Sequence, residues 1–374
     1  MYDVIILGAG PAGLMAGRSL KDSNLKYLII DSREEIGNTI RFSDTIREED
    51  FLEIFKTTDF KFIKNKIESH EFNFANIKRE LKLPFLELDA KEFFNFLAEP
   101  IKDKIKLNLE VEDINITDEQ ADIKTSKGII RTKLLILTYS HNFKFQKKFG
   151  PLNKETKLIT LYGETFNNHK LEKNKFYLYL TPNTFNYFWA FPKNEETIQM
   201  GYAVNGVKDV KDRFEELAKT LGFNEIQKVS KFGGIFPLNQ TKSYSNRVLI
   251  TETASAFLYP FIGEGLNYSL KSGKIAGDIS IEACKNNKFD EDFLKTYETV
   301  WKKEFQDKIN ARDMFREISE FVMKNGKESL IMGQSDKNLT NFLLKGRFPL
   351  KTKLEYKSIN SKNPLLKIAS KIIS

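Results

Sequence analysis

The 374-residue chain contains a single cysteine, Cys284, and only three histidines. One cysteine excludes an internal disulfide framework and fits a reducing compartment. His70, His141 and His169 lack the spacing of a metal site, so we expect no metal centre. No apolar run approaches the roughly 18 residues that span a bilayer, and Asp3 interrupts what would be the apolar region of a signal peptide. These absences favour a cytoplasmic globular protein.

The net positive charge is small in the body of the chain and concentrated near its end. The net charge is +8, and residues 343–374 alone carry eight Lys or Arg against one acid, Glu355. No recognisable nucleic-acid-binding module accompanies this excess, so we expect no nucleic-acid partner. Residues 364–373 repeat apolar side chains at helical spacing, with Lys367 and Lys371 opposite. Two interpretations stay open: peripheral contact with the inner face of an anionic membrane, or a terminal helix packed on the body.

A glycine-rich turn follows the first predicted strand. The turn reads Gly-Ala-Gly-Pro-Ala-Gly, from Gly8 through Gly10, Pro11 and Ala12 to Gly13. In a nucleotide-binding turn, the first glycine makes the tight bend and the second lets phosphates come close. The third glycine lets the strand and the helix pack together. We therefore predict that this turn binds a nucleotide.

The predicted elements around this turn complete a strand–helix–strand unit. A helix is predicted from Ala12 to Asp22, and a second strand covers residues 27–31. The helix N-terminus offers unpaired N–H groups and a favourable dipole to a pyrophosphate. Asp31 lies eighteen residues after Gly13. This is about the distance at which an acid accepts hydrogen bonds from ribose hydroxyls.

A second glycine-rich stretch lies about 250 residues later in the chain. It runs from Pro260 through Gly263 and Glu264 to Gly265, after a predicted strand over 248–251 and before a predicted helix. Two such passages from strand to helix indicate one nucleotide cofactor that is bound by two distant parts of the chain.

The region between the two glycine-rich stretches is rich in predicted β-strands. The clearest strands cover residues 176–180, 187–191 and 198–202, and a helix is predicted over 209–221. Alternation places Tyr187, Trp189 and Phe191 on one face of a strand, with Phe188 and Ala190 on the other. The first face has two interpretations, an ordinary core or the wall of a pocket for an apolar substrate.

Taken together, these features resemble the flavoproteins of the aromatic hydroxylase fold, and within them the geranylgeranyl reductase family. The resemblance covers about residues 1–290. It rests on both glycine-rich stretches, Glu35-Ile36-Gly37 through Arg41, the strand from Tyr187 to Lys193 followed by Gly201, and Gly233-Gly234 with Pro237. The Tyr-x-Trp-x-Phe-Pro-Lys strand favours the reductases over the related hydroxylases.

The resemblance implies an α/β fold in which a Rossmann-like FAD-binding domain is interleaved with an antiparallel-sheet substrate domain, plus a helical C-terminal region. The FAD-binding domain would comprise residues 1–42, 90–142 and 240–290. The β-rich substrate or cap domain would comprise 43–89 and 143–239, and a helical, basic region would cover 291–374.

The resemblance also implies FAD as the cofactor and the reduction of carbon–carbon double bonds in a prenyl-type or other apolar substrate. Flavin N5 would deliver the hydride, so no catalytic side chain is named. Electrons would come from NAD(P)H or a reduced redox protein. Besides the first turn, the expected cofactor contacts are Asp31, Arg41, Thr253, Pro260, Gly263, Glu264 and Gly265. The expected substrate contacts are Tyr187, Trp189 and Phe191.

Several positions depart from the family pattern. Thr253 stands where the family has an aspartate that binds the ribityl chain, and Tyr139-Ser140 stand in place of an Asp-Gly pair. Ala90 replaces an arginine, and Phe42 replaces a cysteine. These departures keep two alternatives open: a flavin-dependent monooxygenase or halogenase, and a non-catalytic lipid-binding protein with the same fold.

Overall fold

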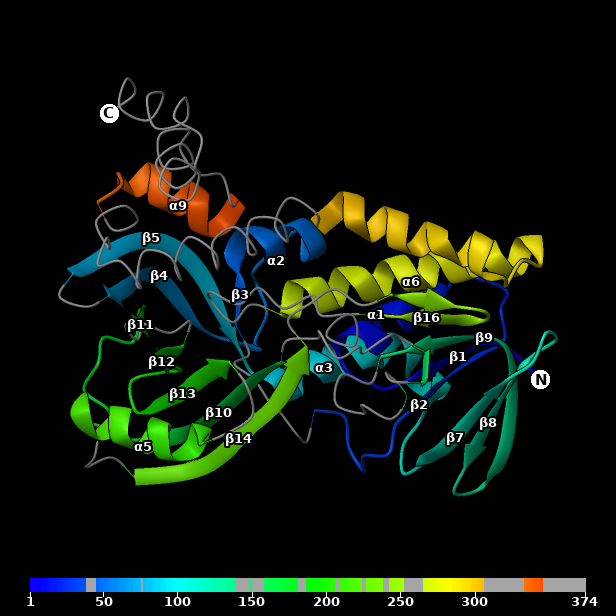
Figure 1. Cartoon of the computed structure of the whole chain (residues 1–374), viewed down its shortest axis with the longest axis horizontal. Helices are drawn as coiled ribbons and strands as arrows, with labels where there is room; N and C mark the ends of the chain where they lie inside the picture. Colours follow the sequence, from blue (N-terminus) through cyan, green and yellow to red (C-terminus); the bar gives the residue numbers. More distant parts are fainter. Residues whose placement is uncertain are drawn as a thin grey trace, which may run out of the picture.

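The computed structural model describes residues 1–37, 45–74, 77–138, 145, 148–149, 158–180, 186–205, 209–223, 227–237, 242–251, 265–305 and 333–345. Two eight-stranded sheets, connected by repeated crossings of the chain, form the framework (Figure 1). The chain builds β1 and β2 of the first sheet, then β3 to β5 of the second. It returns for β6 to β9, crosses again for β10 to β14, and ends in the first sheet with β15 and β16.

The first sheet has a parallel centre in the order β16-β9-β1-β2-β6. Its strands are β1 (Tyr2–Leu7), β2 (Tyr27–Ile30), β6 (Ile105–Lys106), β7 (Val111–Ile116), β8 (Ala121–Thr125), β9 (Gly128–Leu137), β15 (Tyr244–Ser245) and β16 (Val248–Ile250). β1 and the second half of β9 are nearly all apolar because both faces of the sheet are covered. β7 and β8 extend the sheet as an antiparallel hairpin beside β9.

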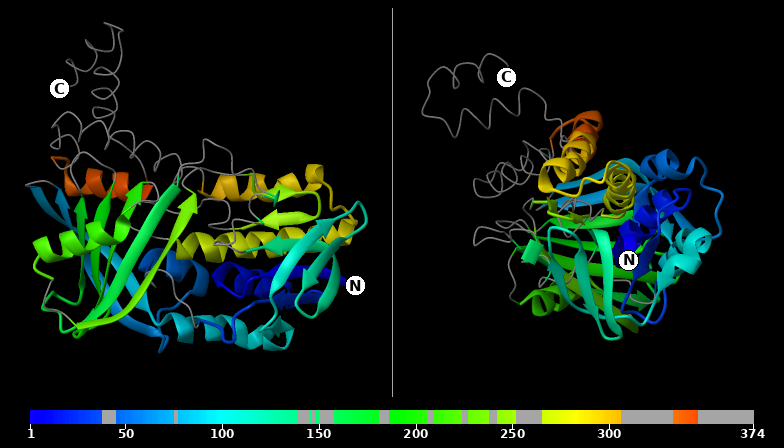
Figure 2. Two further views of the ribbon diagram at one scale, coloured as in Figure 1. Left: turned by 60° about the horizontal axis from the view of Figure 1, so that its bottom comes forward. Right: turned by 90° about the vertical axis from the view of Figure 1, so that its right-hand side faces the viewer.

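Three helices and a 3₁₀ turn cover one face of this sheet. They are α1 (Pro11–Leu20), α3 (Ala90–Ala98), α6 (Leu266–Asn286) and the turn η1 (Glu99–Lys104). α1 and α6 lie side by side in both views of Figure 2. Their backbones are so close that a Cβ at Gly273 would lie 2.1 Å from the carbonyl oxygen of Ala12. The helices that follow the two glycine-rich stretches are therefore direct neighbours.

The second sheet has the order β14-β10-β13-β12-β11-β4-β5-β3. Its strands are β3 (Thr45–Arg47), β4 (Ile63–Phe74), β5 (Ile77–Leu88), β10 (Leu158–Asn167), β11 (Lys175–Leu180), β12 (Tyr187–Pro192), β13 (Thr197–Asn205) and β14 (Gln227–Pro237). The pairs are antiparallel, except that β11 runs parallel to β4. The sequence predicted β11, β12 and β13, but the long hairpin β4–β5 has no counterpart among the predicted strands.

The two faces of the second sheet contact different partners. Helix α5 (Val210–Thr220) covers one face, where Phe188 and Ala190 pack with Phe214. On the other face, Tyr187, Trp189 and Phe191 join the main core, which also contains residues of β1 and α1. The alternation predicted for β12 is therefore confirmed, and α5 matches the helix predicted over 209–221.

Helices from the end of the chain pack across both sheets. Residues 291–305 are helical, and Trp301 is fully buried in the main core. Helix α9 (Asp336–Lys345) packs on β5 (Figure 1), and Arg79 forms an ion pair with Asp336. Helix α2 (Glu48–Phe55) follows β3. The predicted α/β class with two interleaved parts is confirmed; the tail helix predicted over 364–373 lies outside the described residues.

Candidate functional site

The first glycine-rich turn has the geometry that the sequence predicts. Gly8 has a φ of +111°, a backbone conformation that favours glycine. A Cβ at Gly13 would lie 1.8 Å from the carbonyl oxygen of Gly8, so the third glycine allows the helix to contact the turn. Thr138, at the end of β9, donates a hydrogen bond from Oγ1 to the carbonyl oxygen of Leu7 at 2.6 Å. The Thr138 hydroxyl therefore connects the end of β9 to the end of β1, where the glycine-rich turn begins.

The N-terminus of α1 is suited to bind phosphate. Gly10 is its N-cap residue, Pro11 is the first helical residue, and no described side chain caps the helix. A Cβ at Gly10 would have no heavy atom within 4 Å. The space beside the Gly10 α-carbon is thus open, and the uncapped N–H groups and the helix dipole at this end of α1 favour an anion. Ala12 is buried where α1 contacts α6.

Asp31 follows β2 directly and is almost completely buried. It accepts a hydrogen bond from the backbone N–H of Ala9 at 2.7 Å, and Arg33 binds both of its carboxylate oxygens. Burial opposes ionisation of Asp31, but hydrogen bonds and charge from Arg33 outweigh it and hold its pKa below the ordinary value. Asp31 thus links the glycine-rich turn to the end of β2. Its predicted contact with a ribose stays a prediction.

The second glycine-rich stretch is described only where its helix begins. Gly265 is the N-cap residue of α6, while Arg41, Thr253, Pro260, Gly263 and Glu264 lie outside the described residues. Two polar side chains flank the stretch. Among the described residues, the hydroxyl of Thr251 and both polar atoms of Asn267 are buried and find no hydrogen-bond partner. Buried polar atoms are nearly always satisfied, so these two side chains are suited to a polar partner from outside the described residues, such as a polar ligand.

Thr251, Asn267 and Arg33 were not predicted as site residues from the sequence. Asn267 had a local signal, because asparagine is a poor helix former and stands at the second helical position after a glycine. Arg33 had a weaker signal, an opposite charge two residues from Asp31. Thr251 had none, because burial of a hydroxyl depends on the tertiary structure.

These observations fit an FAD. An open helix N-terminus suits the pyrophosphate, and the unsatisfied side chains of Thr251 and Asn267 suit a polar ligand between β16 and α6. When bound, FAD supplies two-electron chemistry at the flavin ring. The described residues contain no group of three metal-ligating side chains.

The predicted substrate residues lie together on the core-facing side of the second sheet. Tyr187, Trp189 and Phe191 are all buried, and Trp189 lies flat across β13. A Cβ at Gly201 would lie 2.2 Å from Cζ2 of Trp189, so only glycine leaves room for the indole. Phe176 stacks on Phe191 with ring centroids 4.0 Å apart. The face is apolar, and its contact with a substrate stays a prediction.

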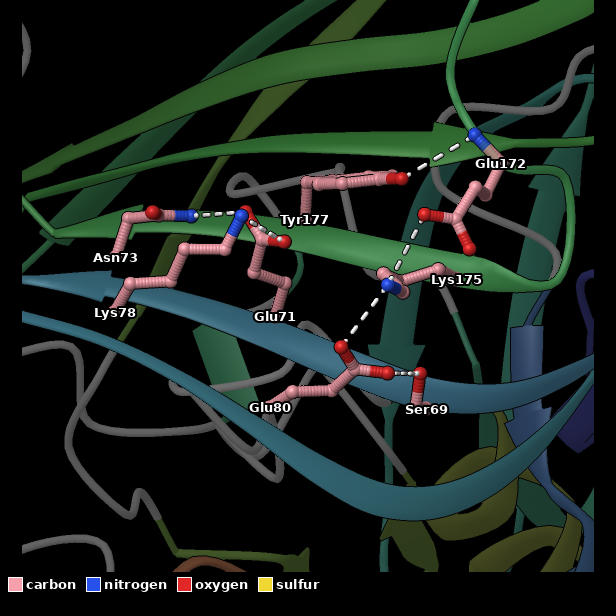
Figure 3. A network of polar contacts seen from close by, with 8 residues as sticks. All are labelled: Ser69, Glu71, Asn73, Lys78, Glu80, Glu172, Lys175 and Tyr177. Atoms are coloured by element: carbon pink, nitrogen blue, oxygen red, sulfur yellow. Dashed lines mark hydrogen bonds and ion pairs between the residues drawn. The ribbon is translucent and has the colours of Figure 1, made fainter.

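The opposite side of the same sheet is held by a polar network (Figure 3). Lys175 contacts Glu80 at 3.0 Å and Glu172 at 3.2 Å, while Ser69 donates a hydrogen bond to Glu80 at 2.7 Å. Glu71 forms an ion pair with a lysine of β5. These contacts join β4, β5 and β11, so the charged residues of this region stabilise the sheet on the side away from the aromatic face.

Comparison with protein families and curated proteins gives consistent matches. Residues 5–178 match the family described as pyridine nucleotide-disulphide oxidoreductase. The digeranylgeranylglycerophospholipid reductase of Methanocaldococcus jannaschii is 25% identical over 348 residues, which cover 86% of this chain and 87% of that protein. The reductase of the same name from Methanococcus aeolicus is 26% identical over 347 residues, covering 85% and 88% of the two chains.

Solved structures share the fold over the whole chain. A geranylgeranyl bacteriochlorophyll reductase-like protein from Thermoplasma acidophilum has a TM-score of 0.80 at 18% identity, covering 100% of this chain and 99% of its own. A flavin-dependent brominase has a TM-score of 0.74 at 13% identity, covering 97% and 100%. Within the part of the chain that the structure describes, we find no helix with the length and apolarity needed to cross a membrane.

Proposed function

We propose that the chain is an FAD-dependent oxidoreductase that reduces carbon–carbon double bonds of a prenyl lipid by hydride transfer from flavin N5; its similarity to the reductases above supports this proposal. The observation that carries this proposal is the pairing of an open nucleotide-binding turn with a buried aromatic face. The turn suits the dinucleotide, and the aromatic face suits a long apolar chain.

Each described part of the chain has a separate task in this proposal. The N-terminus of α1 binds the pyrophosphate through its N–H groups, and Gly10 leaves room for it. Asp31, held by Arg33, receives the adenosine ribose. The side chains of Asn267 and Thr251 form hydrogen bonds with polar atoms of the cofactor near α6.

The aromatic face would orient the substrate and exclude water. Trp189 and Phe191 are apolar and buried, and burial of prenyl carbon against them would contribute about 25 cal/mol for each Å². Glu264, Gly263 and Arg41 are proposed to contact the cofactor from the undescribed segments. Electrons would reach the flavin from NAD(P)H or a reduced redox protein.

The test is an anaerobic single-turnover experiment. Purified protein is loaded with FAD, reduced with dithionite and mixed with a digeranylgeranyl phospholipid in detergent. We expect the oxidised flavin spectrum to return at the rate of product formation, with a mass gain of two hydrogens for each reduced double bond. Failure to bind FAD, or a flavin that stays reduced in the presence of every prenyl lipid tested, would contradict the proposal.

The same preparation distinguishes the alternatives. A hydroxylated or halogenated product that forms only with oxygen would identify a monooxygenase or halogenase. Protein that copurifies with lipid but never binds FAD would identify a lipid-binding protein. Peripheral membrane contact through the basic tail is a separate proposal, tested by cosedimentation with anionic vesicles before and after removal of residues 346–374.

A further inference from the structure

A buried ion pair lies on the aromatic face of the second sheet. Oε1 of Glu87, near the end of β5, lies 2.8 Å from Nζ of Lys193, directly after β12. The Glu87 side chain is 2% exposed and that of Lys193 is 21% exposed. Alternation along β12 puts Lys193 on the same face as Trp189 and Phe191. The pair therefore places two ionic groups on a face that is mainly aromatic and otherwise carries the polar side chains of His70 and Gln199.

Among the described residues, the strand neighbours of Glu87 leave Lys193 as the partner of its charge. In the sheet register, Thr45 of β3 and Asn65 of β4 lie opposite Glu87, and neither is charged. Burial raises the pKa of the Glu87 carboxyl, while the charge and hydrogen bond of Lys193 act in the opposite direction. A buried carboxylate of this kind persists only because a cation lies beside it.

The pair lies where the second sheet meets the FAD-binding part of the molecule. Glu87 precedes Asp89 by two residues, and Asp89 caps α3, which packs on α1. Thr45, opposite Glu87, comes directly after the segment that contains Arg41, an expected cofactor contact. Glu87 and Lys193 are thus connected on one side to the cofactor-binding elements and on the other to the aromatic face.

The other titratable side chains described on this face are less able to supply a proton. His70 is fully buried, and burial lowers its pKa to about 3, so the ring is neutral near pH 7. Burial raises the pKa of Tyr187, whose side chain is 4% exposed. Lys193 alone among these three is ion-paired with a carboxylate and partly open to solvent, which could restore a proton that it donates.

We propose that Lys193 is the proton donor of the double-bond reduction and that Glu87 positions its ammonium group. This inference rests on the proposed function. One carbon of the double bond takes a hydride from reduced flavin, and the other takes a proton from Lys193. The π bond breaks, two C–H bonds form, and the flavin is oxidised by two electrons. Lys193 is left as a neutral amine, which solvent protonates again.

The test measures flavin reoxidation by a prenyl lipid in anaerobic single turnovers of the FAD-loaded, reduced protein. Lys193→Met is compared with Lys175→Met, which removes a lysine with two ion pairs from the opposite face of the same sheet. We expect Lys193→Met to slow reoxidation by about 100-fold or more, as for loss of a general acid. Lys175→Met keeps the wild-type rate. Flavin affinity, measured by fluorescence titration, stays unchanged in both variants.

The pH profile separates proton donation from a structural role. In the wild type, reoxidation slows as pH rises through the pKa of Lys193 and its proton is lost. Glu87→Gln removes the neighbouring negative charge, which lowers that pKa and moves the decline to lower pH. Lys193→Arg retains the positive charge beside Glu87, so we expect it to fold even if Lys193→Met is unstable. Arginine cannot donate its proton, so we expect reoxidation in Lys193→Arg to remain slow.

The outcomes separate the two proposals. If wild-type protein is not reoxidised by any prenyl lipid, the proposed function is wrong. If the wild type is reoxidised while Lys193→Met and Lys193→Arg match it in rate and pH profile, the function stands and Lys193 is not the proton donor. If both variants are slow and Glu87→Gln moves the decline in reoxidation rate to lower pH, both proposals are supported.

Discussion

At the scale of single residues, Gly10 and Gly13 differ in the space beside their α-carbons. Gly13 contacts the backbone of Gly8, whereas Gly10 is surrounded by open space. Gly13 therefore serves the packing of the protein itself. No contact with the described residues requires the absence of a side chain at Gly10, so we predict that its place beside a ligand does.

This difference predicts opposite effects of two alanine substitutions. Gly13→Ala forces a methyl group against the Gly8 carbonyl and should lower the free energy of unfolding by about 1–3 kcal/mol or more. Gly10→Ala should leave the fold intact but weaken FAD binding at least about tenfold, or about 1.4 kcal/mol. Urea unfolding and flavin fluorescence titration measure the two quantities. Equal flavin affinity in Gly10→Ala and wild type would contradict this division.

His70 predicts a pH dependence of stability. Its pKa is lowered to about 3 by burial, against an ordinary value of 6.5. Between these values the unfolded chain binds a proton that the folded chain does not, so stability falls as pH falls from 6.5 towards 3. Above 6.5 the contribution is constant.

The comparison variant is His70→Phe, because His70 packs among Phe85 and Phe176. It should remove a slope of about 1.4 kcal/mol per pH unit from the free energy of unfolding between pH 4 and 6. Chemical denaturation at several pH values gives this slope for both proteins. Parallel curves would show that His70 is already protonated in the folded state.

At the scale of elements, β12 and β13 are matched by one aromatic–glycine contact. The Trp189 indole occupies the place of a side chain at position 201, directly across the strand pair. The contact lets the large ring lie flat on the sheet, which keeps the apolar face smooth. The glycine of β13 thus leaves the space that the tryptophan of β12 fills, although the two strands were predicted separately.

A double-mutant cycle tests this contact. Gly201→Ala should destabilise the protein by about 1–3 kcal/mol, because a methyl group would overlap the indole. In a Trp189→Phe background the same substitution should cost less, since the atoms that it meets belong to the larger ring. Denaturation of the four proteins gives the coupling energy. Additive effects would mean that Trp189 can move aside without cost.

At the scale of the whole molecule, one hydrophobic core runs through both sheets. It contains Val4 of β1, Leu14 of α1, Phe72 of β4, Trp189 of β12 and Trp301 of the helix over 291–305. Within the described residues this cluster is continuous from the first sheet to the second. We therefore expect the two interleaved parts to unfold together rather than as independent domains.

The two tryptophans report on this cooperativity from separate regions. In Trp301→Phe, fluorescence reports on β12, and in Trp189→Phe it reports on the C-terminal helix, because the chain has two Trp residues. We expect each fluorescence transition to coincide with the loss of circular dichroism in the same protein. A fluorescence midpoint separate from the circular dichroism midpoint in either variant would indicate independent unfolding of that region.

The elements that sequence predicted best are those with an uninterrupted local pattern. β1 and β12 are continuous apolar runs, α5 shows a clear helical periodicity, and the first turn has its glycines at fixed spacing. The hairpin β4–β5 was missed because its register shifts at two places, between Ile63 and Asn65 and between Ile67 and Ser69. Each irregularity breaks the two-residue alternation on which strand prediction depends.

The parts of the candidate site that depend on backbone conformation could be predicted from the sequence. The parts that depend on the burial of a polar side chain could not. Gly8 and Gly13 have backbone roles that glycine spacing encodes. Asn267 and the ion pair of Glu87 with Lys193 stand out only because residues from distant segments bury them. A charge or amide becomes informative only when the fold removes it from water, which no local pattern records.

The repeated crossing of the chain between the two sheets has a consequence for biosynthesis. β1 is synthesised first, but its neighbours β9 and β16 come from residues 128–137 and 248–250, and α6 comes later still. Until the ribosome has released residues beyond 286, the face of α1 that α6 covers stays exposed to solvent. Pairing at such sequence separation is slow, and the exposed nascent chain is prone to aggregate. Chaperone demand and expression yield should therefore depend on how fast the second half of the chain is translated.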